Sequence, residues 1–332
     1  MKVVFFHRKP KSFHYSVEIM FSCIRELLPS NVVPTVAVSK YDSSGIAKRF
    51  YNVLEAYFRQ GDINHITGDV HFLSYCLSRK KTILTILDCV VDYNTSGFKN
   101  VLLRYFWYVL PERCVDYITV ISESTKKELL KFIKCSPDKV HVIPACISPK
   151  FSKTPKVFNK NNPVILQIGT TQNKNLIRVI EAISGINCRL DIVGQIDEEI
   201  RFYLERFRIE YSQSQFLTDE EVLKKYQNCD ILMFASTYEG FGMPIIEANV
   251  IGRPVITSDI YSMPEVAGNA ACIVNPYNVG EIRTAVLKIV TDDFYRDGLV
   301  QAGYANGDKY SASAIASKYL ELYEQIHKGN NS

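Results

Sequence analysis

The sequence lacks long apolar runs and paired cysteines. Its first residues, MKVVFFHRKP, hold only four consecutive apolar residues before charged ones, too few for a signal-peptide core or a membrane span. The nine cysteines stand singly, without a Cys-x-x-Cys pair, and are expected to be reduced core thiols. We therefore expect a cytoplasmic protein.

Several functional signatures are absent as well. No Gly-x-Gly-x-x-Gly follows a strand, which argues against a nicotinamide oxidoreductase. No Asp-x-Asp follows a strand, and no His/Cys cluster offers a metal site. No module typical of nucleic-acid binding occurs. The expectation is a protein with no metal, no other cofactor and no nucleic-acid partner.

The composition instead indicates two folded domains. A chain of 332 residues with 47% hydrophobic residues can build two cores of about 150 residues each. Residues 1–150 carry 21 Lys+Arg against 13 Asp+Glu, a net charge of +8, and the rest of the chain has a net charge of −4. The basic half suits an anionic partner such as a lipid phosphate, a membrane surface or nucleic acid. A chance surface imbalance remains the alternative.

Short runs rich in Val and Ile alternate with helical patterns, which is typical of parallel sheets covered by helices. We predict domains at 1–150 and 151–310, joined by a polar, proline-containing linker within 147–162. The apolar face of a helix over 311–327 is expected to pack back on the first domain. The predicted strands are 3–6, 32–38, 63–66, 82–87, 117–121, 140–143, 164–168, 189–193, 231–234, 254–257 and 271–274.

The segment 229–259, CDILMFASTYEGFGMPIIEANVIGRPVITSD, carries the most information about chemistry. A buried strand runs into a loop with two glycines, and a helix then opens near Met243, with Pro244 in its first turn and Gly252 at its end. The start of such a helix, at the carboxyl edge of a sheet, attracts anions such as a diphosphate. Glu239 and Glu247 bracket that position and suit sugar or ribose hydroxyls.

Glu239 and Glu247, separated by seven residues in EGFGMPIIEANVIGRPVITSD, resemble the donor-site signature of retaining glycosyltransferase family 4. Residues 168–183, 214–232 and 263–276 resemble further segments of that family in the same order. The resemblance covers 140–325. It implies the GT-B fold, in which two Rossmann-like, doubly wound α/β domains face each other across a cleft.

By this resemblance Lys174, at the start of a helix over 174–184, contacts the donor diphosphate, Glu239 lies at the transferred sugar and Glu247 binds ribose. It also places the donor base near the loop 211–217. Without the resemblance, Lys174 and Glu247 have a plainer interpretation as solvated residues. The catalytic residues implied are Glu239 and Lys174, and the donor-binding set is Gly169, Thr170, Lys174, Glu239, Gly240, Phe241, Gly242, Met243, Pro244, Ile245 and Glu247.

Two positions depart from the family. Many relatives have Gly-Arg where this sequence has Gly169-Thr170. A cationic side chain that binds phosphate is thus replaced by a hydroxyl, unless Arg178 supplies the charge. Relatives commonly have His-Asp where this sequence has Leu87-Asp88, which puts a catalytic detail, or catalysis itself, in doubt.

The resemblance makes the first half the acceptor domain. The acceptor-side candidates are Arg8, Lys9, His14, His71 and Asp88, and the basic turn 7–16 suits an anionic acceptor. A solvated basic turn, a core histidine at 71 and a capping role for Asp88 are the alternatives. The segments 46–59 and 98–113 mix aromatic and basic residues as membrane-interface helices do, and buried helices give the same pattern.

Together these features predict a retaining, hexosyltransferase-like and metal-independent enzyme. It would transfer sugar from a nucleotide-sugar co-substrate to a saccharide or lipid-linked acceptor in cell-surface polysaccharide biosynthesis, possibly as a peripheral protein on the cytoplasmic face of the membrane. A non-catalytic GT-B subunit that binds a partner glycosyltransferase, and a sugar-nucleotide epimerase or hydrolase, are the alternatives.

Overall fold

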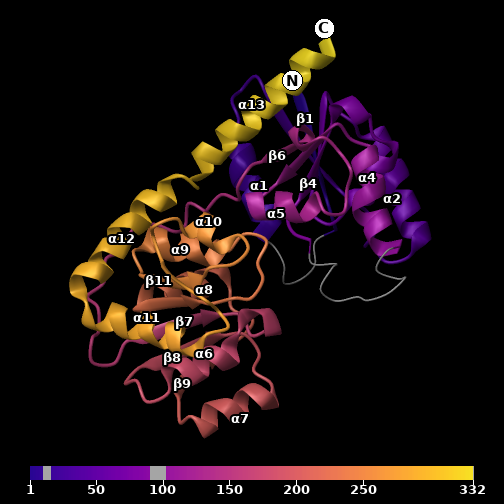
Figure 1. The fold of residues 1–332 in the computed structure, drawn as a ribbon. Helices are drawn as coiled ribbons and strands as arrows, with labels where there is room; N and C mark the ends of the chain where they lie inside the picture. The colour runs from indigo at the N-terminus through magenta and orange to yellow at the C-terminus, as the bar shows by residue number, and fades with distance from the viewer. Residues whose placement is uncertain (10–15, 90–101, 332) are drawn as a thin grey trace. The chain divides into compact units, whose positions relative to one another are not determined.

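Two α/β units make up the chain in a computed structural model that describes residues 1–9, 16–89 and 102–331 (Figure 1). The first unit joins Met1–Ser148 to the C-terminal segment that begins at Ala312, and the second is Pro149–Ser311. Each unit is built on a six-stranded sheet in which every pair of neighbouring strands is parallel. The doubly wound α/β class predicted from the sequence is therefore confirmed.

The sheet of the first unit has the strand order β2-β1-β3-β4-β5-β6. All six strands were predicted, with ends that differ by one residue at most, because each is a short run rich in β-branched residues. Their bounds are Lys2–His7 (β1), Val33–Val38 (β2), Ile63–Thr67 (β3), Thr82–Ile86 (β4), Tyr117–Val120 (β5) and Val140–Val142 (β6). The helices and helical turns are α1 (Ser16–Glu26), α2 (Ile46–Phe58), η1 (His71–Cys76), η2 (Arg79–Lys81), η4 (Tyr105–Val109), α4 (Leu110–Arg113), α5 (Glu123–Leu129) and η5 (Pro137–Lys139).

The C-terminal helix α13 (Ala312–Asn331) is part of the first unit (Figure 1). Its Tyr319, Tyr323 and Ile326 are buried. The hydroxyl of Tyr323 lies 2.7 Å from Nδ1 of His65 in β3, and Nε2 of the same ring lies 2.7 Å from the Thr85 hydroxyl. Aromatic packing and this hydrogen-bonded chain tie the helix to the sheet.

The second sheet has the order β12-β11-β10-β7-β8-β9. Its strands are β7 (Val164–Ile168), β8 (Arg189–Val193), β9 (Glu210–Ser214), β10 (Ile231–Phe234), β11 (Val255–Ser258) and β12 (Cys272–Val274). Its helices and turns are η6 (Gln172–Lys174), α6 (Leu176–Ile183), α7 (Glu198–Arg206), α8 (Asp219–Asn228), α9 (Met243–Ile251), α10 (Met263–Ala267), α11 (Val279–Thr291) and α12 (Asp293–Asp308). Residues 211–214, which we expected to be a loop, belong to the edge strand β9.

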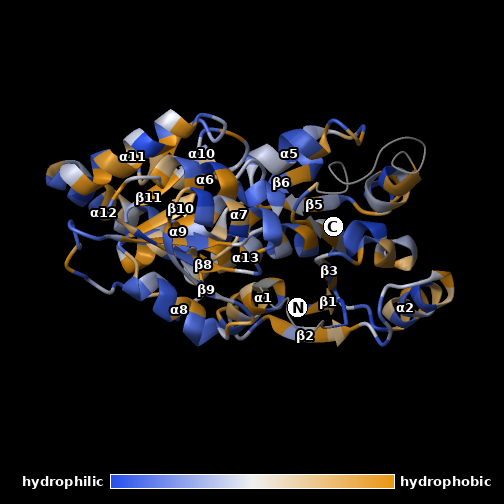
Figure 2. Ribbon diagram, turned by 90° about the horizontal axis from the view of Figure 1, so that it is seen from below, coloured by the Kyte–Doolittle hydropathy of each residue, from blue (hydrophilic) through white to orange (hydrophobic). Residues whose placement is uncertain are grey.

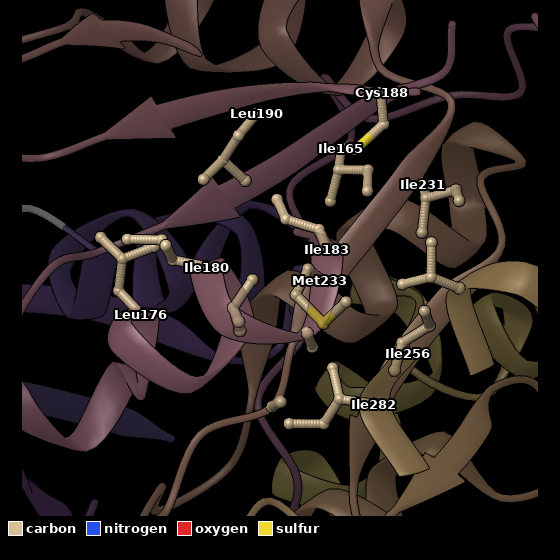
Figure 3. Close-up of a cluster of buried hydrophobic side chains, with 14 of the residues drawn as sticks. Ile165, Leu176, Ile180, Ile183, Cys188, Leu190, Ile231, Met233, Ile256 and Ile282 are labelled. Atoms are coloured by element: carbon tan, nitrogen blue, oxygen red, sulfur yellow. The ribbon is translucent and has the colours of Figure 1, made fainter. Parts of the chain in front are cut away.

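Figure 3 shows the core on one face of this sheet, where strand side chains meet helices α6 and α11. Ile165, Met233 and Ile256 come from β7, β10 and β11, while Ile180 and Ile282 come from the two helices, and all five are fully buried. This packing fixes the end of β10, from which the glycine loop starts.

The segment between the units is held in place rather than loose. Asp230, which is buried, accepts hydrogen bonds from the amides of Asn159 (3.1 Å) and Val164 (2.8 Å) and pairs with the Lys156 ammonium. The Arg253 guanidinium donates to the Thr154 carbonyl at 3.0 Å. These contacts fasten the segment that the polar composition predicted to be a linker to the second unit.

No helix among residues 1–9, 16–89 and 102–331 combines the length and the hydrophobicity needed to cross a membrane. Residues 98–101 of the segment 98–113 lie outside the described residues. Its described part forms η4 and α4, where Tyr108 is buried while Tyr105 and Phe106 are exposed. The described part therefore has a buried side and an exposed side, and a membrane contact of this segment stays a prediction.

Candidate functional site

The loop after β10 and the start of α9 form the centre of the site at the carboxyl edge of the second sheet. Gly242 takes a left-handed conformation (φ 106°) just before the helix, Pro244 lies in its first turn, and Gly252 (φ 88°) ends it. A side chain at Gly242 would be strained at this φ and would come within 3.0 Å of Ile245. The strand–loop–helix geometry predicted from the sequence is confirmed.

Lys174 reaches this edge from the turn after β7. It ends the 3-10 turn η6, Asn175 is left-handed (φ 61°), and α6 starts only at Leu176. The predicted helix start at 174 is therefore wrong. The Asn175 side-chain amide donates to the carbonyls of Ala235 (2.9 Å) and Pro276 (2.6 Å), so contacts with the segments after β10 and after β12 hold this strained backbone.

Lys174 and Glu239 meet as an ion pair, with Nζ 2.6 Å from Oε1. Their side chains are only 19% and 16% exposed, and the ammonium also lies 4.8 Å from the centre of the Phe234 ring. Gly169 (φ 88°) makes room for the lysine, because a Cβ there would lie 2.9 Å from two Lys174 carbons. The structure thus brings together three residues that the resemblance assigned to the donor.

The two substitutes considered for the missing phosphate cation are already engaged. The Thr170 hydroxyl donates to the Gln195 carbonyl at 2.5 Å, so its proton is not available to a phosphate in this conformation. The Arg178 guanidinium donates to Oδ1 of Asn175 at 2.8 Å and lies 5.3 Å from the Tyr277 ring centre. Lys174, whose ammonium pairs with Glu239, stays the cation that the resemblance assigns to the diphosphate.

The amide cap proposed for residues 243–245 needs correction. Pro244 has no N–H, and the Ile245 amide donates to the Gly242 carbonyl at 3.0 Å. Met243 keeps its amide at the positive end of α9, preceded by Gly240 and Phe241 in the loop. The backbone offered to an anion is therefore the end of the loop and the first helical residue.

Glu247 is not a solvated helix residue. It is half-buried on α9 and accepts a hydrogen bond from the hydroxyl of Tyr226, which is itself fully buried in α8. Burial raises the pKa of Glu247 to about 7, although the Tyr226 hydrogen bond acts in the opposite direction. Sequence reasoning did not find Tyr226, because no sequence pattern links two residues that lie on different helices and 21 positions apart.

The first-unit candidates do not form a free basic patch. Arg8 pairs with Glu18 (3.1 Å) and Asp69 (2.7 Å), so its charge is balanced by two carboxylates. Lys9 is exposed, and His14 lies outside the described residues. An anionic acceptor at the basic turn stays a prediction, in which the charge of Arg8 is balanced within the first unit.

His71 is a core histidine. It is 4% exposed, its Nδ1 lies 2.8 Å from the Trp107 carbonyl, and burial lowers its pKa. His71 thus has the core position given above as its alternative interpretation. Asp88 is exposed in the loop after β4, and its carbonyl accepts from the Tyr108 hydroxyl at 3.3 Å.

The described part of the chain contains no group of three or more His, Cys, Asp or Glu side chains suited to a metal ion. A cavity of about 250 Å³ does occur in the second unit, but at the other edge of its sheet. It is lined by Asp230 and Pro254, which precede β10 and β11, and by Arg253, Arg296 and Tyr304. Its volume alone does not mark the functional site, because parallel α/β sheets bind ligands at the carboxyl ends of strands.

Comparisons with known proteins place this geometry in a family. Residues 150–306 match the model of the family described as glycosyl transferases group 1. The serotype-specific mannosyltransferase WbdA of Escherichia coli is 27% identical over 236 residues, which cover 64% of this chain and 29% of WbdA. The amylovoran biosynthesis glycosyltransferase AmsD of Erwinia amylovora is 25% identical over 77% of this chain and 75% of its own length.

A solved structure shares the fold across both units. The Anabaena protein HepE, in complex with UDP and glucose, superimposes with a TM-score of 0.78 over 98% of this chain and 100% of its own, at 15% identity. The family match covers nearly all of the second unit and contains Gly169, Lys174, Glu239 and Glu247. The second unit therefore matches the family glycosyl transferases group 1, and the chain has the GT-B fold.

Proposed function

We propose that the chain is a retaining glycosyltransferase, which takes a sugar from a nucleoside-diphosphate donor and passes it to a saccharide or lipid-linked acceptor in polysaccharide biosynthesis. The observation that carries the proposal is the Lys174–Glu239 pair at the carboxyl edge of β7 and β10, inside the family match. The names of the relatives WbdA and AmsD support the assignment to a saccharide product.

In this proposal Lys174 neutralises the diphosphate as the bond to the anomeric carbon breaks. The start of α9 adds a positive dipole end to the same place. When the donor binds, the Lys174 ammonium leaves its ion pair with Glu239 and contacts the phosphate. The Glu239 carboxylate then stabilises the positive charge that develops on the transferred sugar. Glu247 accepts hydrogen bonds from the ribose hydroxyls.

Release of nucleoside diphosphate tests this function. A panel of nucleotide sugars is first screened by thermal shift, and the stabilising donors are then incubated with saccharide or lipid-linked acceptors. We expect release that depends on an acceptor. Acceptor-independent turnover would indicate an epimerase or hydrolase, and donor binding without turnover would indicate a non-catalytic subunit; either result contradicts the proposal.

Catalysis should need no divalent metal, because Lys174 and the start of α9 supply positive charge at the leaving group. We expect the initial rate to be the same in a chelator and in added magnesium or manganese. Loss of activity in the chelator that either metal restores would contradict this assignment.

The donor KM should fall as the pH rises through about 7, since the ionised Glu247 accepts ribose hydrogen bonds better than the neutral acid. With a pKa near 7, the ionised fraction rises roughly tenfold from pH 6 to pH 8, so KM should fall by a similar factor. Glu247→Gln should raise KM and abolish its pH dependence. An unchanged pH profile in this variant would refute the role.

The raised pKa of Glu247 also makes the free energy of unfolding of the donor-free protein depend on pH. In the folded state the Glu247 carboxyl keeps its proton up to about pH 7, whereas in the unfolded chain it loses this proton near its ordinary pKa of 4.5. The contribution of Glu247 to the free energy of unfolding is therefore fully present below about 4.5 and is lost as the pH rises to about 7.

A peripheral membrane contact is the further part of the proposal, supported by the net charge of +8 in residues 1–150. We expect sedimentation with vesicles that contain phosphatidylglycerol, stronger at low salt than at high salt, and less with neutral vesicles. Equal sedimentation with both kinds of vesicle, or with neither, would contradict it.

A further inference from the structure

Helix α2 exposes its large apolar side chains instead of burying them. Ile46, Phe50, Leu54 and Phe58 follow one another at four-residue spacing, so they form one row along the helix, and they are 41–88% exposed. The face that packs on the first unit is made by small or polar residues, namely Asn52, Val53 and Ala56. This is the reverse of the pattern of a surface helix whose apolar stripe faces a core.

A second exposed segment lies beside α2. Leu102, Leu103, Tyr105 and Phe106 are 40–49% exposed. The Arg49 guanidinium of α2 lies 5.7 Å from the centre of the Trp107 ring, which follows this segment directly. Figure 1 draws α2 next to α4, and Figure 2 shows apolar residues along α2. The apolar surface is defined here as Ile46, Phe50, Leu54, Tyr57, Phe58, Leu102, Leu103, Tyr105 and Phe106.

Cations and amphipathic aromatic rings border the apolar surface. The Lys40 ammonium lies 5.2 Å from the Tyr51 ring centre and 5.6 Å from that of Tyr41. Residues 40–59 hold four basic and two acidic side chains, a net charge of +2. Tyrosine and lysine beside an apolar row are typical of segments that lie at the headgroup level of a bilayer.

The second unit offers a contrast. Its Phe202 and Phe294 are 57% and 92% exposed, but they lie on two different helices, α7 and α12, as single exposed residues do on most proteins. In the described part of the first unit the exposed aromatic side chains all lie on α2 and η4, while Leu27 and three valines of β2 are exposed elsewhere. Residues 1–150 carry the positive charge of the chain. Two copies paired symmetrically through the apolar surface would bring like charges together.

We propose that the apolar surface docks on an anionic lipid bilayer. Its aromatic and aliphatic side chains enter the boundary between headgroups and acyl chains, while Lys40 and Arg49 contact lipid phosphates. The proposal rests on the membrane contact proposed above, but not on the assignment of the donor site, and it names the face that makes the contact.

Trp107 provides the direct readout, because it is the only tryptophan and lies beside the apolar surface. The full chain is mixed with phosphatidylglycerol vesicles that contain brominated phosphatidylcholine, whose bromines quench tryptophan within the acyl region. We expect a blue shift and quenching of Trp107 on binding. Unquenched fluorescence in the sedimenting protein would overturn the proposal, since another face would then carry the contact.

Variants complete the test. Phe50→Ser/Phe58→Ser should lower the vesicle partition coefficient at least about tenfold, since each aromatic ring loses its burial in lipid. The matched control Phe202→Ser/Phe294→Ser removes two exposed rings from the second unit and should bind like the parent chain. The proposal would be overturned if the two double variants bound vesicles equally or lost binding equally. It would also be overturned if the parent chain were a dimer that only Phe50→Ser/Phe58→Ser dissociates. The thermal shift induced by a donor should be unchanged in both double variants. This control separates a loss of lipid binding from a failure of the proposed function.

Discussion

Glu239→Gln is expected to lower kcat on the order of 10²-fold, while the donor KM changes little. The carboxylate pairs with Lys174 before the donor binds and is proposed to face the sugar carbon that becomes positive in the transition state. Loss of one such contact costs about 3 kcal/mol in the barrier, which corresponds to the expected rate change. Initial rates at saturating donor and acceptor measure it.

Glu247→Gln is the comparison for this variant, because the same chemical change is made eight positions further along the chain. It should act mainly on KM, since ribose is held in the ground state and in the transition state alike. The assignment is wrong if Glu239→Gln keeps the kcat of the parent chain while Glu247→Gln abolishes activity. Thermal unfolding curves establish that both variants are folded.

Lys174→Met should lower kcat/KM by about 10²- to 10³-fold, because it removes the cation closest to the proposed leaving group. Methionine keeps an unbranched apolar stem next to Gly169 and Phe234, so the change isolates the charge. Donor binding should weaken as well, since the phosphates carry their charge in the ground state.

Lys225→Met is the matched control for Lys174→Met. Lys225 pairs with Asp191 at 2.8 Å, and the two side chains are buried to a similar degree, but the pair links α8 to the middle of β8. Its loss should lower stability and leave kcat/KM close to that of the parent chain. Equal losses of kcat/KM in the two variants would show that ion-pair packing, and not phosphate binding, explains the effect.

The sequence predicted most strands because their buried runs of Val and Ile stand out against polar surroundings. Strand β9 (Glu210–Ser214) was missed because EYSQS carries no apolar run and pairs only with β8 at the edge of the sheet. Its existence depends on a neighbouring strand, which no local pattern reports. The capping box at Thr218 and Glu221 was predicted correctly, since its residues are close in sequence.

Site features that depend on distant contacts were predicted less well. The turn at Lys174 and Asn175 is held by carbonyls 60 and 101 residues away, so a helix pattern could not show where α6 begins. Arg8 looked free because Asp69, which balances its charge, lies 61 residues further along. Lys174 was implied by family resemblance, whereas Glu239 was also indicated by its place in the loop before α9, and the structure adds their direct contact.

Amide hydrogen exchange with a stabilising nucleotide sugar tests the central claim most directly. Binding at the proposed edge should slow exchange in residues 169–176 and 238–247, and Lys174→Met should weaken this protection. The cavity of about 250 Å³ at the opposite edge, lined by Lys153, Arg253 and Tyr304, should exchange as in the free protein. Protection of residues 153–158 and 296–304 with no change at 238–247 would contradict the account.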